Sequence, residues 1–64
     1  MKPIDELMQR KPQFRTKIEA EIQKQQLNNE TLFYLPFTSE TVQDWIVLMD
    51  KESNFRGYIE VDAF

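Results

Sequence analysis

The side chains of this 64-residue sequence that could carry chemistry are carboxylates, lysines and a few hydroxyls, because histidine and cysteine are both absent. Ser-His-Asp and Cys-His nucleophilic sites are therefore excluded. Glu60 and Asp62 would project from the same side of a predicted strand, where two carboxylates could act as acid and base. Solvated acids that protect a sheet edge explain this pair better, so we predict no catalytic residue and no enzymatic activity.

A second acidic pattern has the spacing of a calcium-binding loop. Asp50, Glu52 and Asn54 occupy the positions of its first three ligands. Phe55 stands where such a loop needs glycine, and Val61 stands where it needs a bidentate glutamate. A hairpin turn explains the pattern equally well, because Asp, Ser and Asn favour turns. We predict no metal site and no cofactor.

Positive charge is concentrated in the first half of the chain. Residues 1–26 carry six basic and four acidic side chains, whereas residues 27–64 carry two basic and seven acidic ones. A cationic helix face can contact phosphates, which makes nucleic-acid binding the alternative function. Acids share the same predicted helix and no glycine-rich phosphate loop is present, so we favour a solvated face. The phosphate-contacting residues in the alternative are Arg10, Lys11, Arg15, Lys17 and Lys24.

The length predicts a single domain spanning residues 1–64, helical and basic over 1–27 and sheet-forming and acidic over 30–64. A chain this short buries only about 60% of the surface that its unfolded form exposes. No disulfide or zinc site can compensate, so close packing or oligomerisation must. The N-terminal stretch has no apolar signal region, and the longest apolar run, Trp45–Met49, is too short to cross a bilayer. We therefore expect a cytoplasmic protein without membrane contact.

Two helices are predicted in the first half. A short one follows Pro3 and ends near Arg10, where apolar residues recur at helical spacing. A longer one restarts at Pro12 and ends around residues 26–29, where Asn28 and Asn29 can supply a C-cap or turn. The apolar stripe by which the longer helix should cover a sheet is formed by Phe14, Ile18 and Ile22.

Three strands are predicted in the second half, near residues 31–35, 44–50 and 56–63. Pro36 should stop the first of them at a sheet edge. The resulting fold is α+β, with both helices packed on a three-stranded antiparallel meander in the order ααβββ. Periodicity alone does not separate strand from helix in the apolar run, so a helix over residues 41–50 stays an alternative.

A loop over residues 37–41 should join the first two strands, with Thr38 or Ser39 able to cap one helical turn through Gln43. A second connection, Glu52-Ser53-Asn54 with Asn54 in the left-handed conformation, predicts a hairpin. The pairs in that register are Met49 with Gly57, Val47 with Ile59, and Trp45 with Val61. This register predicts that the helices cover a face lined by Trp45, Val47, Met49, Ile59, Val61 and Ala63.

The second sheet face keeps too much apolar surface to be left in water without a reason. We therefore predict a small non-enzymatic regulatory or accessory protein that binds another protein, or a second copy of itself as a homodimer, through the hairpin edge or the apolar face. A small-molecule substrate is not predicted. The alternative is that the first helix folds over this face. The predicted interface residues are Trp45, Ile46, Leu48, Tyr58 and Phe64.

Overall fold

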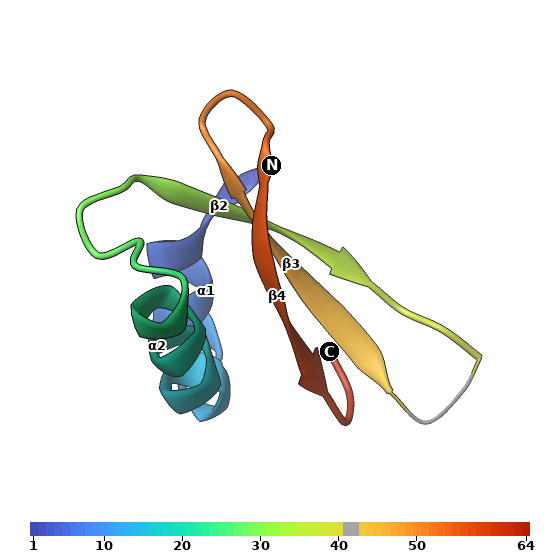
Figure 1. The fold of residues 1–64 in the computed structure, drawn as a ribbon. Coiled ribbons are helices and arrows are strands. Elements are labelled where there is room, and N and C mark those ends of the chain that lie inside the picture. Colours follow the sequence, from blue (N-terminus) through green and yellow to red (C-terminus); the bar gives the residue numbers. More distant parts are fainter. Residues whose placement is uncertain (41–42) are drawn as a thin grey trace.

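The computed structural model describes residues 1–40 and 43–64 as two layers, with helices packed on one side of an antiparallel sheet (Figure 1). Over these residues the sheet has four strands in the order β1-β2-β3-β4. The predicted α+β class is confirmed, but the sheet has one strand more than predicted. The elements are β1 (Lys2–Pro3), α1 (Ile4–Arg10), the 3-10 helix η1 (Pro12–Phe14), α2 (Arg15–Lys24), β2 (Leu32–Phe37), β3 (Asp44–Asp50) and β4 (Phe55–Val61).

Both predicted helices form, and their stripes face the sheet. α1 follows Pro3 directly and ends at Arg10, before the Lys11-Pro12 pair that disfavours helical backbone. The longer helix consists of η1 followed by α2. Phe14 and Ile18 are buried, and Ile22 packs against the same cluster, so the predicted stripe is confirmed.

Asn28 and Asn29 were predicted to supply a C-cap or a turn. They form a turn, in which the N–H of Glu30 donates to the carbonyl of Leu27 at 3.1 Å, but they do not cap α2, which ends earlier. Gln26 adopts a left-handed φ of 59°. The N–H of Leu27 then donates to the carbonyl of Ile22 at 2.9 Å, which satisfies one of the last free carbonyls of the helix. This cap turns Leu27 inward until it is 1% exposed, so it belongs to the core.

β1 is the strand that the sequence did not predict. It pairs antiparallel with β2, with Lys2 opposite Tyr34 and Pro3 opposite Phe33. Two residues are too few to show the alternation by which a strand is recognised. β1 covers only the first half of β2.

β2 continues through Pro36 to Phe37, so the prediction that proline stops this strand is wrong. The N–H of Asp50 donates to the carbonyl of Asn54 at 3.1 Å, so the even-numbered residues of β3 direct their main chain toward β4. Ile46 is among them, and the Pro36–Ile46 pair between β2 and β3 therefore carries no hydrogen bond. The nitrogen of Pro36 therefore points away from β3, so its lack of an N–H group removes no hydrogen bond between β2 and β3, and proline is tolerated there.

The predicted turn over residues 38–43 includes positions 41 and 42, which lie outside the described residues. On either side of them, the hydroxyl of Ser39 donates to the main-chain oxygen of Gln43 at 2.8 Å. Residues 44–50 form a strand, so the helical alternative is wrong for that part of its range.

The β3–β4 hairpin forms, but its turn lies one residue earlier than predicted. The N–H of Ser53 donates to the carbonyl of Asp50, and Ser53, rather than Asn54, takes the left-handed conformation with φ 65°. Lys51, Glu52 and Ser53 are therefore the loop residues, in place of Glu52-Ser53-Asn54. The turn type predicted for the sequence is correct and its position is wrong.

A bulge beside this turn exchanges the two faces of β3. Met49 pairs with Phe55 but Leu48 pairs with Gly57, so Arg56 is an extra residue on β4. Ile46 then lies opposite Ile59, and Trp45 lies opposite Glu60. The predicted register is wrong, and so is the predicted face of β3. Ile59 and Val61 of β4 do lie beneath the helices as predicted, whereas Ala63 is exposed. The buried face consists of Leu32, Tyr34, Ile46, Leu48, Ile59 and Val61, packed against Ile4, Leu7, Phe14, Ile18 and Leu27.

Candidate protein-binding surface

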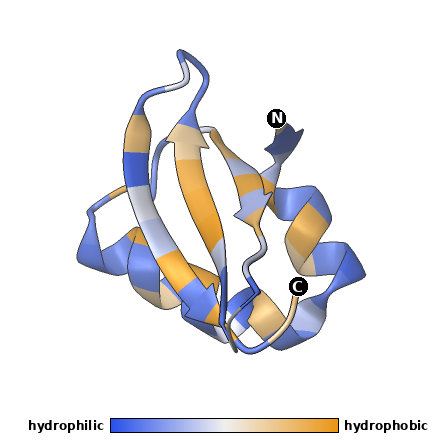
Figure 2. Ribbon diagram, turned by 90° about the vertical axis from the view of Figure 1, so that its right-hand side faces the viewer, coloured by the Kyte–Doolittle hydropathy of each residue, from blue (hydrophilic) through white to orange (hydrophobic). Residues whose placement is uncertain are grey.

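Within residues 1–40 and 43–64, no helix lies over the sheet face opposite α1 and α2 (Figure 2). α1 and α2 both pack on the buried face, through Leu7 and Ile18 among others, so the alternative in which the first helix folds over the second face is wrong. Alternation along β2, β3 and β4 defines the opposite surface. This open face consists of Phe33, Leu35, Phe37, Trp45, Val47, Met49, Phe55, Tyr58 and Glu60.

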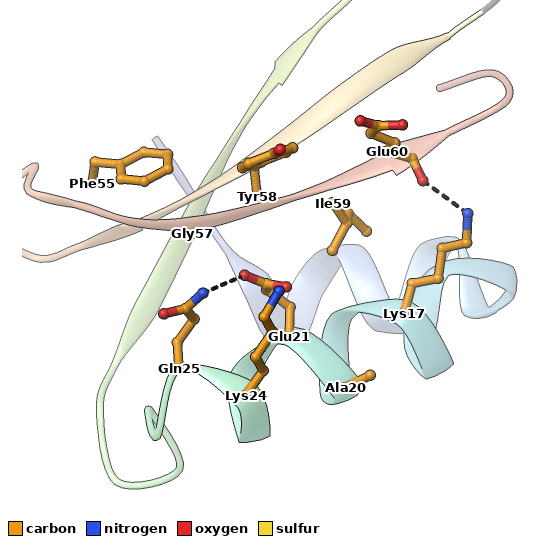
Figure 3. A pocket seen from close by; sticks show the side chains of 10 residues that line it. All are labelled: Lys17, Ala20, Glu21, Lys24, Gln25, Phe55, Gly57, Tyr58, Ile59 and Glu60. Atoms are coloured by element: carbon orange, nitrogen blue, oxygen red, sulfur yellow. Dashed lines mark hydrogen bonds between the residues drawn. The ribbon is translucent and has the colours of Figure 1, made fainter.

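Three aromatic side chains of the open face are largely in water. Phe37, Phe55 and Tyr58 are 50%, 63% and 49% exposed. The rings of Phe55 and Tyr58 lie 6.5 Å apart, and both project from β4 on the side away from α2 (Figure 3). With Trp45 and Val47 these residues line a shallow, almost wholly apolar hollow. Large apolar groups gathered in one exposed hollow are typical of a protein-binding surface.

The open face contains two of the five predicted interface residues, Trp45 and Tyr58. Ile46 and Leu48 are 0% exposed beneath the helices, so a partner would not reach them in this fold. Phe37, Val47 and Phe55 were missed. Counting every second residue from Phe33 through Pro36 would have found Phe37, whereas the bulge that places Phe55 has no comparable sequence signal.

Phe64, the fifth predicted interface residue, is partly buried and packs against the core on the helix side. Its ring lies 6.1 Å from that of Phe14 in a stacked arrangement, and 6.2 Å from that of Tyr34. The ammonium of Lys11 sits 4.3 Å from the Phe64 ring centre and donates to its main-chain oxygen. The N–H of Phe64 donates to Asp44 at 2.8 Å. These contacts join the C-terminal residues to η1 and β3 on the helix side.

A groove separates α2 from the outer strand β4 (Figure 3). At its floor Gly57 has a φ of 153°, a conformation that side chains with a Cβ rarely adopt. Glu21 on α2 accepts a hydrogen bond of 2.9 Å from the amide of Gln25 and lies beside Gly57. The glycine therefore allows close approach of helix and strand.

The acids with calcium-like spacing are engaged in the hairpin turn. The carboxylate of Asp50 accepts from the N–H groups of Glu52 and Asn54, each at 2.9 Å, and from the Asn54 side chain at 3.0 Å. The hydrogen bond from the Asn54 main chain, followed by that from its side chain, lowers the pKa of Asp50 below its ordinary value. Arg56 bridges this carboxylate and that of Glu30, with its Nη1 lying 3.5 Å from Asp50. Asp50 thus stabilises the turn.

The basic residues of the nucleic-acid alternative do not form one free surface. Arg10 pairs with Glu6 at 3.0 Å, Lys11 is bound to Phe64, and Lys17 donates to the main-chain oxygen of Glu60 at 2.8 Å. Phosphate contact would compete with these interactions. The alternative stays a prediction.

The structure also bears on membrane spans and on metal sites. Across residues 1–40 and 43–64, none of the helices has the length and apolar character needed to span a bilayer. Over the same ranges, no three potential ligands lie close enough together to hold a metal ion. The cytoplasmic location, the homodimer and the lack of enzymatic activity stay predictions.

The chain is similar to two curated proteins of Dichelobacter nodosus, each named fimbrial assembly protein, one of serogroup E1 and one of serogroup I. It is 38% identical to each over 47 residues, which make up 73% of this chain and 18% of the relative. The chain thus spans less than a fifth of the length of these relatives. No protein-family model matches it, and no solved structure matches it.

Proposed function

We propose that this chain is a non-enzymatic protein-binding domain that contacts its partner through the open face of its sheet. The observation that carries the proposal is the exposure of Phe37, Phe55 and Tyr58 around one apolar hollow. Aromatic residues dominate the energetics of protein interfaces, and burying one such side chain contributes about 1.5–3 kcal/mol. Two or three of them in one patch can supply the centre of an interface.

The position of the patch on a sheet supports the same proposal. β2, β3 and β4 hold the open-face side chains at fixed spacing, while the hydrophobic core holds the sheet from behind. A surface that is already ordered loses little conformational entropy when it binds. The open face is therefore suited to docking as a rigid unit.

The similarity to two proteins named for fimbrial assembly supports an accessory role in building a multi-protein structure. We extend that role to this chain as part of the proposal. Self-association, which the sequence also predicts, would be one form of it, with a second copy as the partner.

Site-specific photo-cross-linking in cells that express the chain tests the proposal. A photoreactive residue in place of Val47, near the centre of the open face, should form a cross-link to one defined protein. The same residue in place of Gln23, exposed on α2, is the matched control and should not. The substitution Phe37→Ser should abolish the Val47 cross-link. Equal cross-linking from both positions, or none from Val47, would overturn the proposal.

A further inference from the structure

Among the described residues that form the open face, only Glu60 has a charged side chain. Its side chain projects from β4 on the same side as Tyr58 and Phe55 and is exposed (Figure 3). The main-chain oxygen of Glu60 accepts a hydrogen bond from Lys17, but within residues 1–40 and 43–64 its carboxylate has no partner. A single free anion thus stands beside an aromatic cluster.

The sheet register brings this anion next to the only tryptophan of the chain. Trp45 on β3 lies directly opposite Glu60 on β4. The hydrogen bond between Asp50 and Asn54 shows that even-numbered residues of β3 bond to β4, so the Trp45–Glu60 pair is of the wide type without mutual hydrogen bonds. In such pairs the side chains are closest, with Cα atoms about 4.5 Å apart.

We infer that Trp45 and Glu60 form a subsite for an arginine side chain of the partner protein. This inference rests on the proposed function, because the partner must lie on the open face to reach the pair. A guanidinium is planar, so it can stack on the Trp45 indole while its fork of N–H groups bonds the Glu60 carboxylate. An ammonium is a compact, strongly hydrated charge that does not stack, so arginine fits the pair better than lysine.

The surroundings of the subsite determine which residues flank that arginine. Val47 and Tyr58 continue the surface on one side and, with Phe37, line the apolar hollow. Over residues 27–64 there are seven acids and two basic residues, and of the latter Arg56 is already paired with Glu30 and Asp50. An excess of negative charge attracts a cationic partner. The partner segment should therefore carry an arginine next to apolar side chains.

A peptide titration followed by NMR tests the inference on the full 64-residue chain. The probe is acetyl-Leu-Arg-Leu-amide, and its neutral counterpart has norleucine in place of arginine. The arginine probe should shift the indole N–H resonance of Trp45 saturably. The substitution Glu60→Gln should weaken its binding about three- to fivefold, as expected for loss of a partly exposed ion pair. Glu19→Gln, the same change at an exposed position of α2, should leave binding unchanged.

Three results would overturn the arginine subsite: no saturable shift at Trp45, equal affinity for the norleucine probe, or equal affinity in Glu60→Gln. Glu60 is exposed, so its replacement does not threaten the fold. Failure of the subsite is distinguishable from failure of the proposed function. If the norleucine probe binds equally well, the open face still binds apolar groups, and cross-linking from Val47 tests that face without reference to charge.

Discussion

The ammonium of Lys17 on α2 donates a hydrogen bond of 2.8 Å to the main-chain oxygen of Glu60 on β4. β4 is the outer strand of the sheet over the described residues, and this carbonyl points away from β3. By the alternation of an antiparallel strand, the N–H and C=O of Tyr58 point outward as well. Unpaired outer edges are where other strands add, and lysine is a common protection. Lys17 therefore covers part of an edge that could otherwise pair with a second chain.

Replacement of Lys17 by methionine should raise self-association of the chain several-fold, because the outward carbonyl of Glu60 loses its donor while the length of the side chain is kept. Sedimentation equilibrium over a range of concentrations measures the effect. Lys24→Met is the matched control and should behave like the natural chain. Lys24 lines the same groove from α2 but, within residues 1–40 and 43–64, makes no hydrogen bond to β4. Equal association of both variants would show that Lys17 does not protect the edge.

Gly57→Ala should destabilise the fold by about 1–2 kcal/mol, because alanine is strained at a φ of 153°. A Cβ there would also lie 2.8 Å from Oε2 of Glu21, but that atom ends a flexible side chain and can move. Urea unfolding measures the loss. In a Glu21→Ala background the same substitution should cost nearly as much. Full recovery in that background would mean that contact with Glu21, and not backbone strain, is the reason for glycine.

The exchange of faces predicts opposite sensitivities for neighbouring residues of β3. Leu48→Ala should cost about 2–5 kcal/mol in urea unfolding, because Leu48 is fully buried. Val47→Ala should cost about 1 kcal/mol or less, because Val47 lies on the open face. The register predicted from sequence alone requires the reverse order. A larger loss for Val47 would therefore contradict the observed pairing of β3 and β4.

Stability should fall as the Asp50 carboxylate is protonated. Its hydrogen bonds to Asn54 lower its pKa in the folded state relative to the unfolded chain. The resulting stabilisation is present above about pH 4 and is lost as pH falls through the lower folded value. Urea midpoints between pH 7 and pH 2 should thus decline less steeply in Asp50→Asn, which carries no titrating group there. Glu19→Gln, an exposed control, should keep the natural slope, and an identical slope in Asp50→Asn would contradict this role.

The helical half of the fold could be predicted because apolar spacing, helix propensity and the position of proline all indicate the same two helices. Phe14, Ile18 and Ile22 recur every four residues among good helix formers, and Lys11-Pro12 marks where one helix ends. The end of α2 was harder to predict from the sequence. Gln26 has no special preference for the left-handed conformation, so neither the hydrogen bond from Leu27 to Ile22 nor the burial of Leu27 has a signal in the local sequence.

The register could not be predicted because every residue from Trp45 to Met49 is apolar, so alternation does not say which face is buried. Ser53 and Asn54 can both close the turn, and the structure uses Ser53. The shift of the turn alone would have kept the predicted faces. The extra residue Arg56 reverses them, and a bulge follows from pairing across strands rather than from local sequence.

The sequence predicted the type of candidate site, an apolar sheet face, better than it predicted the residues that form it. An apolar sheet face without a helix cover follows from the amount of apolar surface in a chain this short. Its members do not, because they depend on the bulge. Trp45 belongs to the open face although the predicted register placed it beneath the helices, and Phe64 packs against Phe14 and Tyr34.

The open face carries the only tryptophan of the chain, so Trp45 can report its contacts directly. The most direct measurement is the 19F NMR signal of 5-fluorotryptophan at position 45 during titration with the protein that cross-links from Val47. We expect the signal to shift on binding, acrylamide then to quench the indole less, and Phe37→Ser to weaken the complex. A complex that forms with the signal and the quenching of Trp45 unchanged would contradict the assignment of the open face as the binding surface.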